Sequence, residues 1–171
     1  STDPDFQDKL DWVAQFCKDK VEPLEYVFPY AIRSRNPAVK GYVRELQQEV
    51  KDHGLWAIFL DEEFGGPGYG QLKLGLLNEV IGRYPSAPQM FGAAAPDTGN
   101  MEMLAAYGTD EQKERFLKPF LADDTFVLGK GITEPNGGSD NRLPPDDPKA
   151  GVKLRGERRG DEWILNGEKA F

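Results

Sequence analysis

The sequence predicts a mainly α-helical protein whose last quarter turns to β-structure. Apolar residues recur at steps of three and four through residues 1–124, as they do on the buried side of amphipathic helices. After Asp124 the pattern changes to alternation, and eight of the 19 glycines lie in that stretch. The composition, 39% hydrophobic and 11% aromatic, supports a packed core. We therefore expect a helical domain over residues 1–124 and a β domain over residues 125–171.

The first predicted helix begins at the N-terminus. Asp3 is a candidate N-cap, and Pro4 follows at the first helical position, where its missing N–H is tolerated. One apolar stripe then runs along Phe6, Leu10, Val13, Cys17 and Val21. Pro23 and Pro29 predict that an irregular loop follows this helix.

A second helix is predicted from Asn36 and Pro37, which repeat the same start, to Gly54, which suits a helix end. The glycine-rich stretch 65–70 predicts a tight loop. Residues 71–83 are apolar on most sides, which predicts a helix buried in the centre of a bundle.

Two further helices complete the predicted helical domain. One runs from about Asp97 to Tyr107 and stops at Gly108. Thr109 and Gln112 then match a capping box, in which each side chain accepts a hydrogen bond from the other residue's backbone. The helix that they start is expected to end near Ala122.

The remaining residues predict strands. Residues 126–128 are one candidate, and residues 151–158 and 161–166 form a hairpin joined across Arg159 and Gly160. Residues 143–150, which contain three prolines, predict an irregular loop before the hairpin.

Charge and rare residues exclude several classes of protein. The net charge of −8 argues against a nucleic-acid partner, which would require a basic surface. The sequence contains no run of about 18 apolar residues, so no membrane span is predicted. With only Cys17 and His53, neither a disulfide within the chain nor a Cys/His zinc cluster is expected. The first residues do not resemble a secretory or transit peptide; we expect a cytoplasmic protein, with mitochondria or peroxisomes open if the N-terminus is trimmed.

Residues 131–140 are the most informative stretch. These residues predict the end of a strand followed by a glycine-rich turn. Successive backbone N–H groups in such a turn can bind an anion such as a pyrophosphate, and Thr133 and Ser139 add hydroxyl groups. A plain β-turn, whose hydroxyl groups satisfy its own backbone, is the alternative interpretation.

Four stretches, in order, resemble the acyl-CoA dehydrogenase family. Residues 131–140 resemble its signature of a small residue, an aliphatic residue and Thr-Glu-Pro, followed by Gly-small-Ser-Asp. Residues 63–68 resemble its Glu-Tyr-Gly-Gly-x-Gly loop, and residues 107–113 resemble its Tyr-Gly-Thr-x-Glu-Gln-Lys helix start. Residues 161–169 resemble the hairpin that precedes an aromatic residue beside the flavin. In the family, the loop that residues 65–70 resemble lies near the substrate channel. For these residues a purely structural turn is an equally good interpretation.

The resemblance implies an N-terminal helical bundle followed by the first strands of a β-barrel-like middle domain, cut off partway. It also implies bound FAD. Thr133 would hydrogen-bond the isoalloxazine ring, and Ser139 would lie near the FAD pyrophosphate and the acyl-CoA. Lys130 stands where relatives usually have an aromatic or apolar residue. The implied cofactor-binding residues are Lys130, Gly131, Ile132, Thr133, Gly138, Ser139 and Phe171, with Ser139 also binding substrate.

The implied reaction oxidises an acyl-CoA to a 2-enoyl-CoA by removal of an α-proton and transfer of a β-hydride to the flavin. The family's glutamate base lies beyond Phe171, so we assign no catalytic residue here and interpret Glu134 as structural. The implied partners are an acyl-CoA, an electron-transfer flavoprotein or another acceptor, and further copies of the full-length enzyme. The alternative function is a non-catalytic assembly module, or half of a split enzyme completed by a partner chain.

Overall fold

A computed structural model of the chain describes residues 3–122, 128–138 and 151–170. The described residues are mainly helical, with one two-stranded antiparallel sheet, which confirms the predicted fold class. The chain divides into two compact units, 1–128 and 129–171. The domain boundary predicted after Asp124 lies in the stretch 123–127, outside the described residues, so its position stays a prediction. None of the described helices combines the length and the apolar character that a membrane crossing requires.

The first helix begins where its capping residues predict. In α1 (Pro4–Phe16) the Asp3 side chain accepts a hydrogen bond from the Phe6 N–H, and Pro4 occupies the first turn. A π-helical turn (Cys17–Val21) joins α1 to α2 (Glu22–Val27) without a break. The prediction of a loop starting at Pro23 is therefore wrong. The Glu22 N–H already bonds five residues back, to the Cys17 carbonyl, so the regular ladder is shifted where proline cannot donate.

The next long helix, α3 (Pro37–Asp52), follows a short 3₁₀ turn (Ala31–Arg33). The Asn36 side chain accepts the Ala38 N–H at a distance of 3.0 Å. Gly54 adopts a left-handed conformation with φ of 65° just beyond the helix, as predicted for a residue at a helix end.

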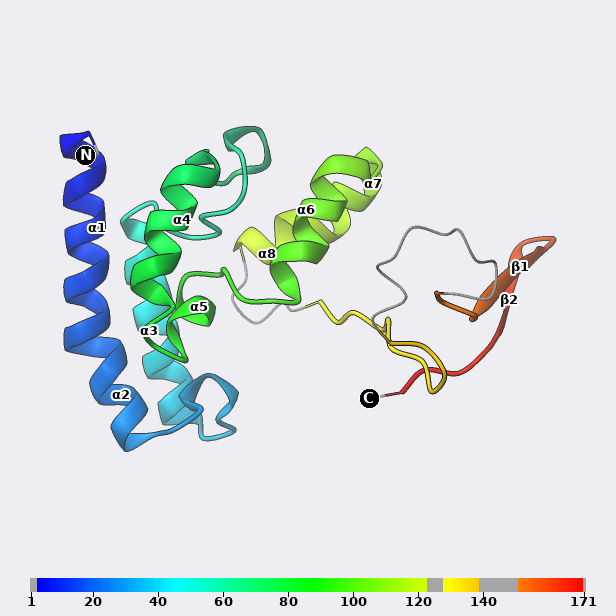
Figure 1. The fold of residues 1–171 in the computed structure, drawn as a ribbon, viewed down its shortest axis with the longest axis horizontal. Helices are drawn as coiled ribbons and strands as arrows, with labels where there is room; N and C mark the ends of the chain where they lie inside the picture. Colours follow the sequence, from blue (N-terminus) through cyan, green and yellow to red (C-terminus); the bar gives the residue numbers. More distant parts are fainter. Residues whose placement is uncertain (1–2, 123–127, 139–150, 171) are drawn as a thin grey trace. The chain divides into compact units, whose positions relative to one another are not determined.

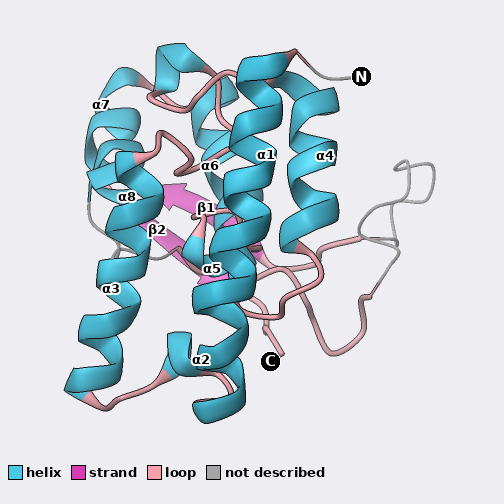
Figure 2. Cartoon of the chain, turned by 90° about the vertical axis from the view of Figure 1, so that its left-hand side faces the viewer, coloured by secondary structure: helices cyan, strands magenta, loops and turns pink. Residues whose placement is uncertain are grey.

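Helices α1 and α3 pack with α4 (Gly70–Ile81) and α5 (Ala87–Met90) around the main core (Figures 1 and 2). The largest fully buried side chains of this core come from all four helices and the segments between them: Phe6, Val13, Val21, Val50, Leu55, Ile58, Leu77, Ile81, Met90 and Phe91. The prediction that residues 71–83 lie in the centre of a bundle is wrong. Leu72 is 80% exposed, and only Leu77 and Ile81 of α4 are buried, because neighbouring helices cover this helix on one side only.

A second helical group follows, formed by α6 (Asp97–Tyr107), α7 (Asp110–Gln112), a π-helical turn (Lys113–Leu117) and α8 (Lys118–Ala122). The predicted capping box is present: the Gln112 N–H donates to Thr109 Oγ1, and the Thr109 N–H donates to Gln112 Oε1. A separate apolar cluster holds this group together, with Ala57, Leu60, Met101, Ala105, Leu117 and Phe120 buried.

The segment between α3 and α4 is a shaped loop, as predicted. It contains a 3₁₀ turn (Glu62–Phe64) and glycines with positive φ at positions 65, 68 and 70. Gly66 is required for a different reason. A Cβ atom there would lie 2.1 Å from the carbonyl oxygen of Leu60, closer than any real contact, so the loop can close only with glycine at this position.

The second unit contains the hairpin of β1 (Arg155–Arg159) and β2 (Glu162–Asn166), paired antiparallel with Glu157 opposite Ile164. The predicted hairpin is therefore present, with a first strand that begins four residues later than expected. Trp163 and Leu165 are 66% and 67% exposed, next to Gly156 on the other strand. The predicted strand 126–128 lies outside the described residues except for Leu128, which belongs to no strand.

Candidate functional site

The predicted cofactor segment contains a compact turn. The Gly137 N–H donates to the Glu134 carbonyl at 3.1 Å, and the two residues form an isolated β-bridge. Pro135 and Asn136 fill the two central positions, which suit proline and asparagine. A Cβ atom at Gly138 would meet no described residue within 4 Å.

The residues just before the turn present hydrogen-bond donors. The Thr133 carbonyl accepts from the Ala170 N–H at 3.0 Å, and the Ile132 carbonyl accepts from Lys169 Nζ at 3.1 Å. The backbone N–H groups of Ile132 and Thr133, and the exposed Thr133 hydroxyl, form no hydrogen bond with any other described residue. The two carbonyl groups thus have partners, while no described residue accepts a hydrogen bond from these donors.

Glu134 anchors this segment from the inside. Its carboxylate accepts the Lys153 N–H at 2.6 Å, the Leu154 N–H at 2.9 Å and Lys169 Nζ at 2.9 Å. The Leu154 N–H, then the Lys169 ammonium and the Lys153 N–H, lower the pKa of this carboxyl from 4.5 to about 2. A carboxylate that is buried, fully bonded and this acidic cannot act as a general base near neutral pH. The geometry agrees with the structural interpretation of Glu134.

Five of the seven predicted cofactor-binding residues lie in the described stretch 128–138. Lys130, Gly131, Thr133 and Gly138 are exposed, and Ile132 is half-buried. The other two, Ser139 and Phe171, lie outside the described residues, so the predicted substrate contact of Ser139 has no structural description here. The roles of all seven stay predictions.

The donor set fits an isoalloxazine ring. The ring presents nitrogen and carbonyl acceptors along one edge, and Thr133 offers both an N–H and a hydroxyl group within one residue. Glu134, the only buried carboxylate among the described residues of this segment, is satisfied by three donors, so it places no unpaired negative charge against an electron-rich ligand. The residues present therefore suit the cofactor that the sequence resemblance implies.

Sequence reasoning missed the part played by Lys169. This residue lies 35 positions from Glu134 and 37 from Ile132, and it has no periodicity or motif spacing that links it to them. One signal was available: a lysine that follows the strand end in the stretch 161–169. Pairing it with Glu134 requires the fold, because the hairpin must first bring the two segments together.

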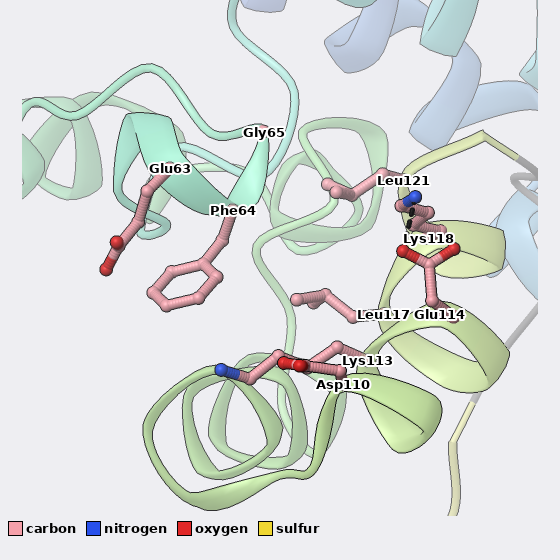
Figure 3. A pocket seen from close by; sticks show the side chains of 9 residues that line it. All are labelled: Glu63, Phe64, Gly65, Asp110, Lys113, Glu114, Leu117, Lys118 and Leu121. Atoms are coloured by element: carbon pink, nitrogen blue, oxygen red, sulfur yellow. Dashed lines mark ion pairs between the residues drawn. The ribbon is translucent and has the colours of Figure 1, made fainter.

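A hollow in the helical unit is lined by residues of two of the sequence motifs, residues 63–68 and residues 107–113. This hollow of about 510 Å³ lies between the Glu62–Phe64 turn and the helical segment that begins at Asp110, and Figure 3 shows the side chains that line it. Phe64, Leu117 and Leu121 line it with apolar groups, and an ion pair joins Glu114 and Lys118 at its edge.

A neighbouring hollow of about 730 Å³ shares Glu63, Phe64 and Lys113 with the first. The Lys113 ammonium lies 5.0 Å from the centre of the Phe64 ring, which favours a cation–π attraction. Leu121 packs closely against Gly65. A Cβ atom on Gly65 would lie only 2.9 Å from the Leu121 Cδ1 atom, so a larger residue would not fit there without a shift of this side chain. Gly65 and Gly66 are therefore needed for close packing, which supports the structural interpretation of this part of the loop.

The single histidine and the single cysteine have structural surroundings. His53 stacks on Trp12 with ring centres 3.9 Å apart, and its Nδ1 lies 2.9 Å from the Glu49 carbonyl oxygen. Cys17 is fully buried, and this burial raises the pKa of its thiol to about 12. Such a thiol is unreactive at neutral pH.

Comparison with known proteins shows which protein family the chain resembles. The family model for the N-terminal domain of acyl-CoA dehydrogenases matches residues 4–124. Acyl-CoA dehydrogenase family member 11 of Mus musculus is 36% identical over 169 residues, which are 95% of this chain and 20% of that protein. The probable acyl-CoA dehydrogenase FadE2 of Mycobacterium tuberculosis is 35% identical over 128 residues, which are 74% of this chain and 29% of that protein.

A solved structure shows the same fold. The structure of a protein described as an acyl-CoA dehydrogenase from Mycobacterium abscessus matches with a TM-score of 0.79 and 30% sequence identity. The match covers 99% of this chain and 42% of that one, so the chain spans only part of the length of the relatives that it matches. With the family model covering most of the chain and the same fold in a solved relative, the chain belongs to the acyl-CoA dehydrogenase family.

Proposed function

We propose that the chain is part of an FAD-dependent enzyme that oxidises an acyl-CoA thioester to a 2-enoyl-CoA. Family membership supports the reaction class, and the donor edge at Ile132 and Thr133 carries the assignment of a flavin. Bound FAD would supply the acceptor for the hydride removed from the β-carbon.

In this proposal the residues of the described stretch 128–138 bind the FAD and orient its isoalloxazine ring. The Thr133 hydroxyl and N–H donate to the ring, where a hydrogen bond also raises its electron affinity. Gly131 and Gly138 let the backbone approach the cofactor closely. Lys130 brings a positive charge to the same edge, and Ser139 and Phe171 complete the cofactor contacts, with Ser139 also reaching the acyl-CoA.

Proton removal is assigned to a residue outside this sequence. Glu134, the buried carboxylate of the segment, is held ionised by three donors and has no capacity left to accept a proton near neutral pH. In keeping with the family resemblance, we assign removal of the α-proton to a glutamate in a further part of the enzyme. An electron-transfer flavoprotein or another acceptor would then reoxidise the enzyme, which we propose forms a homo-oligomer.

The experiment is a reconstitution of the 171-residue chain with FAD. Flavin fluorescence is expected to be quenched on binding, and Thr133→Val is expected to weaken the affinity by about two- to tenfold, the effect of one hydrogen bond. Thr98→Val, in α6, is the matched control and should leave the affinity unchanged. A chain that binds no FAD would contradict the assignment and favour the assembly-module alternative.

The same sample tests the missing base. With an acyl-CoA and an artificial electron acceptor, the chain is expected to give no turnover above that of free FAD. Turnover that depends on this chain alone would show that it contains its own base, and the assignment of proton removal to another region would then be wrong.

A further inference from the structure

We propose that Glu134 and Lys169 form a positioning pair that sets the orientation of the Ile132–Thr133 peptide and thereby the affinity for the cofactor. The identity of that cofactor rests on the function proposed above. The pair contacts no ligand itself in this proposal. It acts through the backbone of the neighbouring residues.

Lys169 makes the decisive contact. Its Nζ atom donates to the Ile132 carbonyl at 3.1 Å and to Glu134 Oε1 at 2.9 Å. The lysine side chain is 21% exposed and the Glu134 side chain 6%, so the ion pair is largely shielded from water. In this setting charge-assisted hydrogen bonds are short and directional.

The rigidity of the peptide unit transmits this contact. The Ile132 carbonyl and the Thr133 N–H belong to the same planar trans peptide and point in opposite directions. A hydrogen bond that holds the carbonyl toward Lys169 therefore turns the Thr133 N–H away from Lys169. That N–H is one of the donors with no partner among the described residues, so Lys169 aims the group that we assign to the flavin.

The next residue reinforces the same orientation. The Ala170 N–H donates to the Thr133 carbonyl at 3.0 Å. Two consecutive residues, Lys169 and Ala170, thus fix two consecutive carbonyl groups, those of Ile132 and Thr133. The segment that carries the donors is aligned along this short stretch of chain.

Glu134 makes the arrangement stable. It pairs with the Lys169 ammonium and also accepts hydrogen bonds from the N–H groups of Lys153 and Leu154. It therefore links the turn at residues 134–137 to the residues just before the hairpin and to Lys169 just after it. Its carboxyl has a pKa of about 2 and therefore stays charged throughout the neutral range. Removing either partner would leave the other as a shielded, unpaired charge, which is strongly unfavourable.

The test compares variants of the 171-residue chain by two readouts. FAD affinity is measured from the quenching of flavin fluorescence, together with the position of the bound flavin's visible absorption bands. Amide hydrogen exchange at Ala170 reports whether residues 132–133 keep their alignment, and exchange at Ile164 reports the integrity of the hairpin.

Lys169→Met removes the charge and keeps the length of the side chain. We expect its FAD affinity to fall by about tenfold or more, the effect of one lost charge-assisted contact, and Ala170 to exchange faster while Ile164 stays protected. Glu134→Gln should act in the same direction. Lys169→Arg keeps the positive charge and can donate to both acceptors, so it should retain most of the affinity. Lys153→Met is the matched control, since only its backbone N–H is used.

The outcomes separate the two proposals. If wild-type chain binds no FAD, the proposed cofactor is wrong, and exchange at Ala170 still decides whether Lys169 orients the segment. If Lys169→Met keeps the wild-type affinity within about twofold, or leaves the exchange of Ala170 unchanged, the positioning pair is overturned. A parallel loss of protection at Ile164 in Lys169→Met, not restored in Lys169→Arg, would show a general structural role and would also overturn it.

Discussion

The helical unit is stabilised by burial of apolar side chains, whereas the C-terminal unit is held by a buried charge. In residues 3–122 two apolar clusters contain most of the buried residues. Among the described residues of 129–171, Glu134 is the only buried one, and its partners are backbone N–H groups and Lys169. Hydrophobic burial is non-directional and additive, but a charged network depends on every partner. The two units should therefore respond to different perturbations.

The largest effect is expected from a cavity in the helical core. Phe91 is fully buried and meets Phe16 edge-on with ring centres 5.7 Å apart. Phe91→Ala should lower the free energy of unfolding by about 3–5 kcal/mol, through lost burial and the cavity left behind. Urea unfolding followed by circular dichroism measures this change.

The control for this variant is Tyr107→Ala, because Tyr107 is 86% exposed and its loss should change stability by less than about 0.5 kcal/mol. Similar values for the two aromatic residues would show that the helical unit does not depend on its apolar core in the way that we describe.

The next effect is confined to the C-terminal unit and depends on pH. A carboxyl whose pKa is lower in the folded state stabilises the fold above the pKa of the unfolded chain and loses this contribution as the pH falls through the folded value. For Glu134 these values are 4.5 and about 2. The Lys153 and Leu154 amide resonances of the folded protein should thus be constant from neutral pH down to about pH 3 and change around pH 2, as the Glu134 carboxyl is protonated.

Glu134→Gln is the control for this titration. It should abolish the acid transition at Lys153 and Leu154 and leave the helical core resonances as they are in the wild type. An acid transition that persists in this variant would assign the pH dependence to another group.

The smallest effect is expected at a helix start. Thr109→Ala removes one half of the capping box, in which Gln112 N–H and Thr109 Oγ1 are 3.2 Å apart, and should cost about 1 kcal/mol of stability. Gln112→Glu keeps an acceptor for the Thr109 N–H and should cost much less. Urea unfolding distinguishes the two variants, and equal losses would contradict the role of the box.

The starts and ends of the helices could be predicted from sequence because their signals are local. Asp3, Asn36 and Thr109 each cap the helix that follows. Two predictions failed because they needed information beyond the local pattern. Pro23 lies inside a helix whose ladder a π-helical turn has already shifted, and Leu72 is exposed despite its apolar surroundings in sequence.

The candidate site was predictable only in part, for the same physical reason. The turn at residues 134–137 follows from Pro135, Asn136 and Gly137, which lie next to one another. The contacts of Glu134 with Leu154 and Lys169 span 20 and 35 residues, and such distant partners emerge only when the chain folds.

The hairpin described above also bears on how the chain behaves at high concentration. The two strands differ in composition: β1 carries Arg155, Glu157, Arg158 and Arg159, whereas β2 carries Trp163, Ile164 and Leu165. Charged side chains discourage the edge-to-edge association of strands, and exposed apolar ones promote it. Self-association and aggregation of the chain would consequently start at β2, and solubility is best improved by polar substitutions at the outward-facing Trp163 and Leu165.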